Sequence, residues 1–237
     1  MTRSGPIFVT GSTGYLGRAL VPALAARGHL VRALVRPGSA ARVPAGAASV
    51  VGDVLDPDGW RSSLGDARTL VHLVGVRKPL PWMARQFRDV DLASVRAMLA
   101  AIRGSSIRHV VYLSVAQPAP VMRAYIAARR EAEILIRAEE YATTILRPWY
   151  VLGPGHHWPH ALRPLYKLFE ALPATRDTAL RTGLLRLPEI VQALVWAVEH
   201  APSGVRVLDV PRLRALGRGG REQVLAAAEL LAAEPAG

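Results

Sequence analysis

The stretch Thr-Gly-Ser-Thr-Gly-Tyr-Leu-Gly at residues 10–17 decides the fold of this chain. It follows the short apolar run at residues 7–9, which has the character of a buried strand. It leads into a stretch of helical period that reaches about residue 27, where Gly28 gives a stop signal. A glycine-rich loop between a strand and a helix is typical of the phosphate-binding turn of a dinucleotide-binding unit.

The glycines of this loop have separate tasks. Gly11 permits the tight turn, Gly14 lets the backbone approach a pyrophosphate, and Gly17 lets the helix pack closely. The helix N-terminus adds free N–H groups and the positive end of the helix dipole. A glycine turn without any ligand is the simpler alternative, because such trios also occur by chance. The residues expected to contact the cofactor here are Gly11, Ser12, Thr13, Gly14, Tyr15, Leu16 and Gly17.

Apolar runs and stretches of helical period alternate along the rest of the chain. Further strands are expected at residues 30–35, 49–52, 69–74, 109–114, 143–146 and 205–210, and the main helices at residues 83–103, 122–140 and 188–200. This alternation predicts an α/β, Rossmann-type fold with a doubly wound, mostly parallel sheet. We expect residues 1–211 to form a single NAD(P)-binding domain. Its small C-terminal substrate-side region falls within residues 149–204, and residues 212–237 form a basic loop and a C-terminal helix.

Composition excludes several classes of function. A chain of 237 residues is long enough for one α/β domain. Because it contains no cysteine, disulfides, thiolate catalysis and cysteine-based zinc sites are excluded. Charged residues or proline interrupt every long apolar run, and the first strand begins too early for a signal peptide. We therefore expect a cytoplasmic protein without a transmembrane segment.

The net charge of +12 is mostly arginine spread along the chain. Because these residues form no single stripe and no reader motif accompanies them, we expect no nucleic-acid partner. A more local use of arginine is to hold a phosphorylated ligand.

The end of the second strand indicates which dinucleotide is bound. NAD-binding sites usually place an acidic residue there to hold the ribose 2′-hydroxyl, but this chain has Arg36. A guanidinium at that point suits the 2′-phosphate of NADP(H), with Ser12, Thr13 and Arg42 able to assist, and NAD(H) is less favoured. Alternatively, Arg36 is one more solvated arginine in a basic chain.

Together these residues resemble an atypical, NmrA-like member of the short-chain dehydrogenase/reductase superfamily, from residue 7 to about residue 210. The motifs behind the resemblance are TGSTGYLG, VGDV at 51–54, HLVG at 72–75, YLS at 112–114, LRP at 146–148 and GPG at 153–155. The resemblance implies three groups of cofactor contacts. They are Asp53 and Val54 at the adenine, Val74, Gly75 and Val76 along the cofactor groove, and Pro148 and Trp149 near the nicotinamide. His72 matches a residue often found on that family's fourth strand, although a hydrogen-bonded core histidine is the simpler interpretation.

The superfamily's chemistry uses a serine, a tyrosine and a lysine four residues after the tyrosine. Here Ser114 ends the fifth strand, Tyr125 opens the next helix, and Arg129 stands at the lysine position. A cation on the same helix face could stabilise a tyrosinate and hold the nicotinamide ribose. Arginine does not deprotonate and is bulkier, so the replacement is not conservative. The alternative is an ordinary surface ion pair between Arg129 and Glu133, one turn later.

The His-His-Trp-Pro-His segment at residues 156–160 is expected to line the substrate pocket. No metal site is expected, because no carboxylate lies nearby and Pro159 opposes a helical pair of ligands.

These features predict an NADP(H)-binding oxidoreductase or isomerase for a small, apolar carbonyl or quinone-like substrate. The alternative is a non-catalytic redox sensor or accessory subunit of a larger complex. A third is an interaction module that uses the basic residues 212–221 at an anionic surface. The two long helices after the fourth and fifth strands form the family's usual dimer face, which is compatible with a homodimer.

Overall fold

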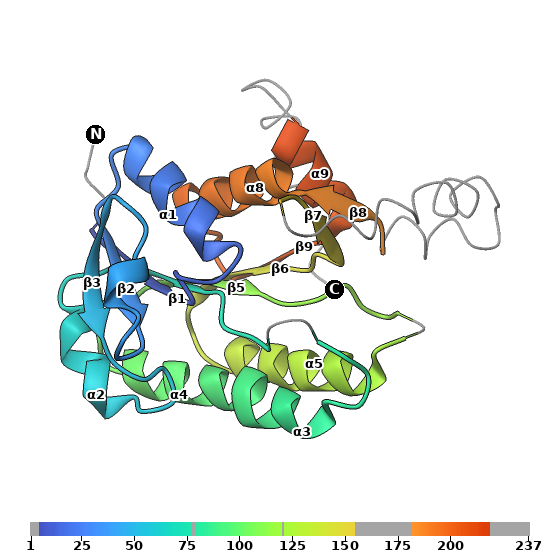
Figure 1. Ribbon diagram of the computed structural model, residues 1–237, viewed down its shortest axis with the longest axis horizontal. Coiled ribbons are helices and arrows are strands. Elements are labelled where there is room, and N and C mark those ends of the chain that lie inside the picture. Colours follow the sequence, from blue (N-terminus) through green and yellow to red (C-terminus); the bar gives the residue numbers. More distant parts are fainter. Residues whose placement is uncertain (1–4, 77–78, 120, 155–181, 219–237) are drawn as a thin grey trace.

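The computed structural model describes residues 5–76, 79–119, 121–154 and 182–218. Seven parallel strands form the central sheet in the order β3-β2-β1-β4-β5-β6-β9 (Figure 1). They are β1 (Ile7–Thr10), β2 (Val31–Val35), β3 (Ala47–Val51), β4 (Thr69–His72), β5 (His109–Leu113), β6 (Ala142–Leu146) and β9 (Val205–Leu208). The order reverses between β1 and β4, which in a doubly wound sheet opens a crevice at the carboxyl ends of these strands. The predicted fold class is confirmed.

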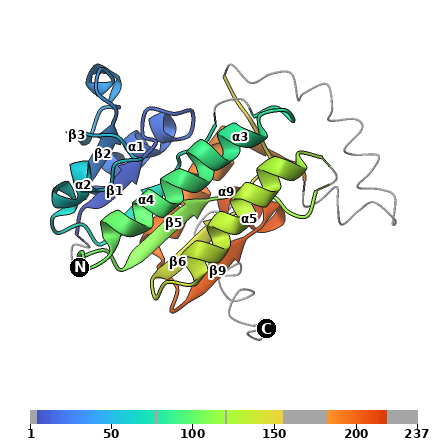
Figure 2. The ribbon, with the colours of Figure 1, turned by 90° about the horizontal axis from the view of Figure 1, so that it is seen from below.

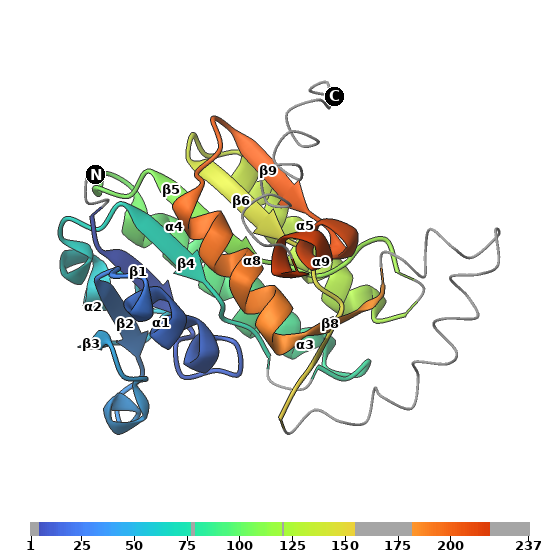
Figure 3. The ribbon, with the colours of Figure 1, turned by 90° about the horizontal axis from the view of Figure 1, so that it is seen from above.

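Helices cover both faces of the sheet. Figure 3 shows α1 (Gly17–Ala26), α8 (Leu187–Glu199) and α9 (Val210–Arg218) on one face. Figure 2 shows α4 (Ala93–Ile102) and α5 (Arg123–Arg137) on the other, together with α2 (Asp58–Arg61) and α3 (Ala84–Gln86). Between α3 and α4 the chain forms a π-helix, η3 (Phe87–Leu92), and short 3₁₀ turns are η1 (Ala40–Arg42) and η2 (Ser62–Leu64).

An apolar layer lies on each side of the sheet, which is why the strands are nearly continuous apolar runs. Under α1 and α8, Leu20, Leu24 and Leu194 pack against Val9 and Val71. On the opposite face the fully buried side chains include Trp60, Met98, Ile102, Tyr112 and Ile136. The two layers fix the sheet and leave its carboxyl edge to the loops.

The structure differs from the sequence prediction in two described segments. A small second sheet pairs β7 (Tyr150–Leu152) with β8 (Leu184–Arg186), and neither strand was predicted because each has only three residues. The expected basic loop after residue 212 is wrong as far as Arg218, because these residues belong to α9, which buries Val210, Leu213 and Leu216. The expected terminal helix and residues 156–160 lie outside the described residues. No helix in the described ranges has the length and apolar character needed to cross a bilayer.

Candidate functional site

The carboxyl edge of the sheet gathers most of the residues singled out from the sequence. Parallel pairing brings the ends of β1 to β6 to one edge. The strands are followed there by the loop of residues 11–17, Arg36, Asp53 and Val54, Val74 to Val76, Ser114, and Pro148 with Trp149. Tyr125 and Arg129 reach the same edge on the first turns of α5. This edge is the candidate site.

The glycine loop has the shape that a phosphate requires. Gly11 has φ +77°, and a Cβ on it would lie 2.9 Å from the backbone carbon of Leu73 on the neighbouring chain segment. A Cβ on Gly17 would overlap the carbonyl oxygen of Gly11 and lie 2.5 Å from that of Ser12. Gly14 is different, because it is exposed and its Cβ would meet only Gly11 O, at 3.1 Å. Gly14 therefore leaves open space where a pyrophosphate would approach.

The helix that follows the loop is suited to the same ligand. No side chain caps the N-terminus of α1, although the Arg18 and Ala19 amides already donate to Gly14 O and Leu16 O. The positive end of the helix dipole still favours an anion at this point. Ser12 is buried and its hydroxyl donates to Leu34 O at 3.4 Å, which ties the loop to the end of β2. Leu16 packs on the core below α1, and the Tyr15 hydroxyl lies against Gly153. These contacts fix the loop on the side that faces the core, whereas Gly14 is exposed.

Arg36 directly follows β2 and is exposed. Its guanidinium makes no ion pair with any described residue, whereas Arg42 donates to the hydroxyl of Ser39 at 2.6 Å. Asp53, after β3, is also exposed, and its carboxylate accepts a hydrogen bond from the amide of Leu55 at 3.0 Å. One cation is thus available beside the end of β2.

His72 is a fully buried core histidine. Its Nδ1 lies 2.8 Å from the Thr10 hydroxyl and its Nε2 lies 3.1 Å from the Ser94 hydroxyl. Burial lowers the pKa of His72 to about 3, helped by the positive charge of Arg129, so the ring is neutral. The simpler interpretation of this residue is confirmed.

Arg129 is buried inside the protein. Its side chain is 4% exposed and its Nη2 lies 2.6 Å from Oδ1 of Asp91, which is fully buried. Nη1 donates to Leu113 O at 2.7 Å and Nη2 donates to Val74 O at 3.3 Å. Burial alone would lower the pKa of Arg129, but Asp91 and two neighbouring tyrosines raise it above its ordinary value. The guanidinium therefore stays charged and joins the ends of β4 and β5.

Asp91 is the site residue that sequence reasoning missed. Its second oxygen, Oδ2, accepts a hydrogen bond from the Val76 amide at 3.0 Å. A Cβ on Gly75 would overlap the Arg129 guanidinium and lie 3.0 Å from Asp91 Oδ1, so only glycine fits between them. The available signal was a carboxylate in the apolar pattern of a helix, between Phe87 and Val95.

Tyr125 lies above this ion pair and is partly exposed. The centre of its ring is 5.0 Å from that of Phe87 and 5.3 Å from the central carbon of Arg129. The same guanidinium donates to the hydroxyl of Tyr112 at 3.2 Å, and its central carbon lies 5.8 Å from the centre of that ring. Burial raises the pKa of Tyr112 to about 12, so that phenol keeps its proton.

Ser114 has a partner that was not foreseen. Its hydroxyl donates to Oε1 of Glu133 at 2.5 Å, and Arg147 clamps the same carboxylate through Nε at 3.0 Å and Nη2 at 2.5 Å. Gln117 donates to it as well, at 2.7 Å. The alternative ion pair between Arg129 and Glu133 is therefore wrong. Arg129 pairs with Asp91 of η3, and Glu133 pairs with Arg147, which follows β6.

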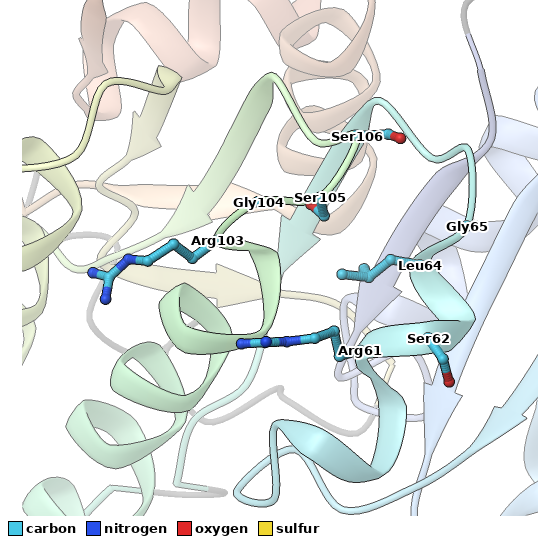
Figure 4. A pocket seen from close by; sticks show the side chains of 8 residues that line it. All are labelled: Arg61, Ser62, Leu64, Gly65, Arg103, Gly104, Ser105 and Ser106. Atoms are coloured by element: carbon cyan, nitrogen blue, oxygen red, sulfur yellow. The ribbon is translucent and has the colours of Figure 1, made fainter.

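A hollow of about 410 Å³ at the opposite edge of the sheet is unrelated to this site (Figure 4). It lies between the turn after α2 and the turn before β5. Its two arginines are already engaged, since Arg61 donates to Ala100 O and Arg103 pairs with Glu139 at 2.6 Å. Within the described ranges no three histidine or acidic side chains cluster as metal ligands would.

Comparison with known proteins agrees with the geometry of the edge. The family described as NAD(P)H-binding matches residues 11–156. The chain is 28% identical over 233 residues to "Ceramide reductase" of Caulobacter vibrioides, an alignment covering 98% of this chain and 72% of that protein. It is 30% identical over 228 residues to "3-diazoavenalumate denitrifying reductase" of a Streptomyces species, covering 84% of this chain and 73% of the other.

Solved structures share the fold. The complex of MoeE5 with UDP-glucose and NAD superposes with a TM-score of 0.65 at 22% identity, covering 96% of this chain and 82% of that one. An NAD-bound short-chain dehydrogenase/reductase superfamily protein from Agrobacterium tumefaciens gives a TM-score of 0.62 at 21% identity, covering 86% and 77%.

Proposed function

We propose that this chain, which belongs to the NAD(P)H-binding family, is an atypical, NmrA-like short-chain dehydrogenase/reductase that acts as an NADP(H)-dependent reductase. Its substrate is a small, apolar carbonyl or quinone-like compound. The observation that supports catalysis most strongly is the partly exposed Tyr125 with the buried Arg129 guanidinium 5.3 Å from its ring. A phenol beside a fixed cation is suited to proton transfer.

The cofactor would be held by backbone more than by side chains. The open face at Gly14 and the uncapped N-terminus of α1 fit the pyrophosphate. The available guanidinium of Arg36 fits a 2′-phosphate, and Asp53 and Val54 lie where the adenine would be bound. Val74 to Val76, Pro148 and Trp149 would border the nicotinamide. When bound, the cofactor supplies the hydride.

In this reaction Tyr125 is the proton donor to the substrate oxygen, as a carbonyl becomes an alcohol. Arg129 stabilises the tyrosinate left behind, since its charge is fixed and buried close to the ring. The Ser114 hydroxyl donates its one hydrogen bond to Glu133, so it offers only lone pairs to a substrate group. It can orient a donor but does not polarise a carbonyl in this arrangement.

One observation favours the second candidate, a non-catalytic NADP(H)-binding sensor or accessory subunit. Both terminal nitrogens of Arg129 are bonded to protein groups, so the side chain offers no exposed donor to the nicotinamide ribose. Lysine at this position of the superfamily has that task. The two candidates share the cofactor and differ in turnover.

Two measurements test the proposal. NADPH should bind more tightly than NADH, and Arg36→Asp should reduce or reverse the difference, while the exposed Arg130→Asp should leave it unchanged. Equal dissociation constants for both cofactors in the wild type would refute the NADP(H) preference. Oxidation of NADPH should then be followed with aldehydes, ketones and quinones. If Tyr125→Phe leaves the detected turnover unchanged, the catalytic role of Tyr125 is wrong; if no substrate is turned over, the sensor is favoured.

A further inference from the structure

The helix η3 and the helix α5 interlock through two pairs of side chains. Phe87 contacts Tyr125, and four residues later in each helix Asp91 pairs with Arg129. Phe87, Asp91 and Leu92 are the buried residues of η3, which is the wide-turned π-helix. Single π-helical turns within α-helices occur frequently at functional sites. The wide turn places a carboxylate directly beneath the cation that faces Tyr125.

Asp91 contacts two parts of the site at once. Oδ1 holds the guanidinium of Arg129 at 2.6 Å, and Oδ2 holds the amide of Val76 at 3.0 Å. Val76 belongs to the segment after β4 that borders the proposed cofactor groove. Nη2 of Arg129 also donates to Val74 O. The ion pair therefore bonds to the first and the last residue of the segment 74–76, and Gly75 between them lies against it.

Stability alone is a poor explanation for this pair. Replacing a fully buried ion pair by apolar side chains of similar size is often neutral or stabilising, because burying two charges has a large desolvation cost. What an apolar pair lacks is direction, since it has no oxygen for the Val76 amide and no donors for Val74 O and Leu113 O.

We propose that Asp91 is a positioning residue, which fixes the Val74–Val76 border of the cofactor groove relative to the helix that bears Tyr125. This inference rests on the proposed cofactor groove. It makes the Asp91–Arg129 pair a means of setting the distance between the bound nicotinamide and the proton donor, through the backbone of residues 74–76 and not through direct contact with substrate.

The test compares variants in which the melting temperature, which reports on stability, and the affinity for NADPH, which reports on positioning, should change independently. Asp91→Leu combined with Arg129→Met removes both charges and should melt at or near the wild-type temperature. Its affinity for NADPH, measured by titration of NADPH fluorescence, should nevertheless fall at least 10-fold. Asp91→Asn keeps an acceptor for the Val76 amide and should bind NADPH with intermediate affinity. The matched control is Glu131→Gln, which breaks the exposed Arg96–Glu131 pair between α4 and α5 and should bind NADPH as the wild type does.

Amide hydrogen exchange of residues 74–76 in the cofactor-free protein gives a second readout. Exchange there should be faster in the double variant than in the wild type and unchanged in Glu131→Gln. Wild-type exchange and wild-type NADPH affinity in a folded double variant would overturn the positioning role. If the double variant does not fold, Asp91→Asn decides, with wild-type exchange and affinity overturning the role. If the wild type itself binds no NADPH, the proposed function fails, while the exchange measurement still reports on Asp91.

Discussion

Replacing Gly14 and Gly17 by alanine, one at a time, should separate ligand binding from folding. Both glycines lie in the same loop, and neither has a positive φ, so an added methyl group is not excluded by the backbone conformation. Their surroundings differ. The Cβ at Gly14 would meet one carbonyl oxygen at 3.1 Å, whereas the Cβ at Gly17 would overlap two carbonyl oxygens of the loop.

The expected magnitudes follow from these contacts. Backbone oxygens at Gly17 have little freedom to move, so overpacking should cost about 1–3 kcal/mol of unfolding free energy. For a chain of this size that lowers the melting temperature by roughly 2–12 °C. Gly14→Ala should leave stability within about 0.5 kcal/mol. Its methyl group would occupy the open face of the loop, and NADPH should bind about 10-fold more weakly, which corresponds to about 1.4 kcal/mol.

Thermal melting and titration with NADPH measure the two effects. Gly204→Ala is the control, because a Cβ there would have nothing within 4 Å. It should melt and bind as the wild type does. If Gly14→Ala binds NADPH with unchanged affinity, no pyrophosphate approaches this loop. If Gly17→Ala melts with the wild type, the close packing at the start of α1 does not matter for stability.

Two further predictions concern buried polar groups. Burial holds the pKa of His72 at about 3 against 6.5 when exposed, so between these values the unfolded chain binds a proton that the folded chain does not. The unfolding free energy should therefore fall by up to about 1.4 kcal/mol per unit of pH below 6.5, and His72→Gln should flatten this slope. An equally steep slope in His72→Gln would refute the assignment. Glu133→Gln should cost about 2–4 kcal/mol in urea unfolding, because it leaves Arg147 without its charge partner, and a loss below about 0.5 kcal/mol would show that the clamp is unimportant.

The fold could be predicted from the sequence because its signals are local. Each strand of the central sheet is a short apolar run followed by a turn, and each long helix has its own period. The expected helix at residues 83–103 corresponds to α3, η3 and α4, and the expected helix at 122–140 corresponds to α5. The strands β7 and β8 were missed because three residues contain no usable period, and their pairing depends on segments far apart in the chain.

The candidate site could be predicted only in part. The positions of Arg36 and Ser114 at the ends of β2 and β5 follow from the strand pattern. The partners of Ser114 and Arg129 could not be predicted in this way. Glu133 reaches Ser114 through the packing of α5 on the sheet, and Asp91 reaches Arg129 through the packing of η3 on α5. Asp91 belongs to a different helix, and no spacing rule connects it with Arg129.

The sequence by itself thus determined that a phosphate loop joins the first strand to the first helix, because glycine spacing, apolar run and helix start all lie within a few residues. Only the tertiary structure decided what the polar groups behind that loop do. A hydroxyl or guanidinium bonds to whatever the packing brings within about 3 Å. For Ser114 that is Glu133, and for Arg129 it is Asp91, so the cation expected at the ribose is instead buried beneath Tyr125.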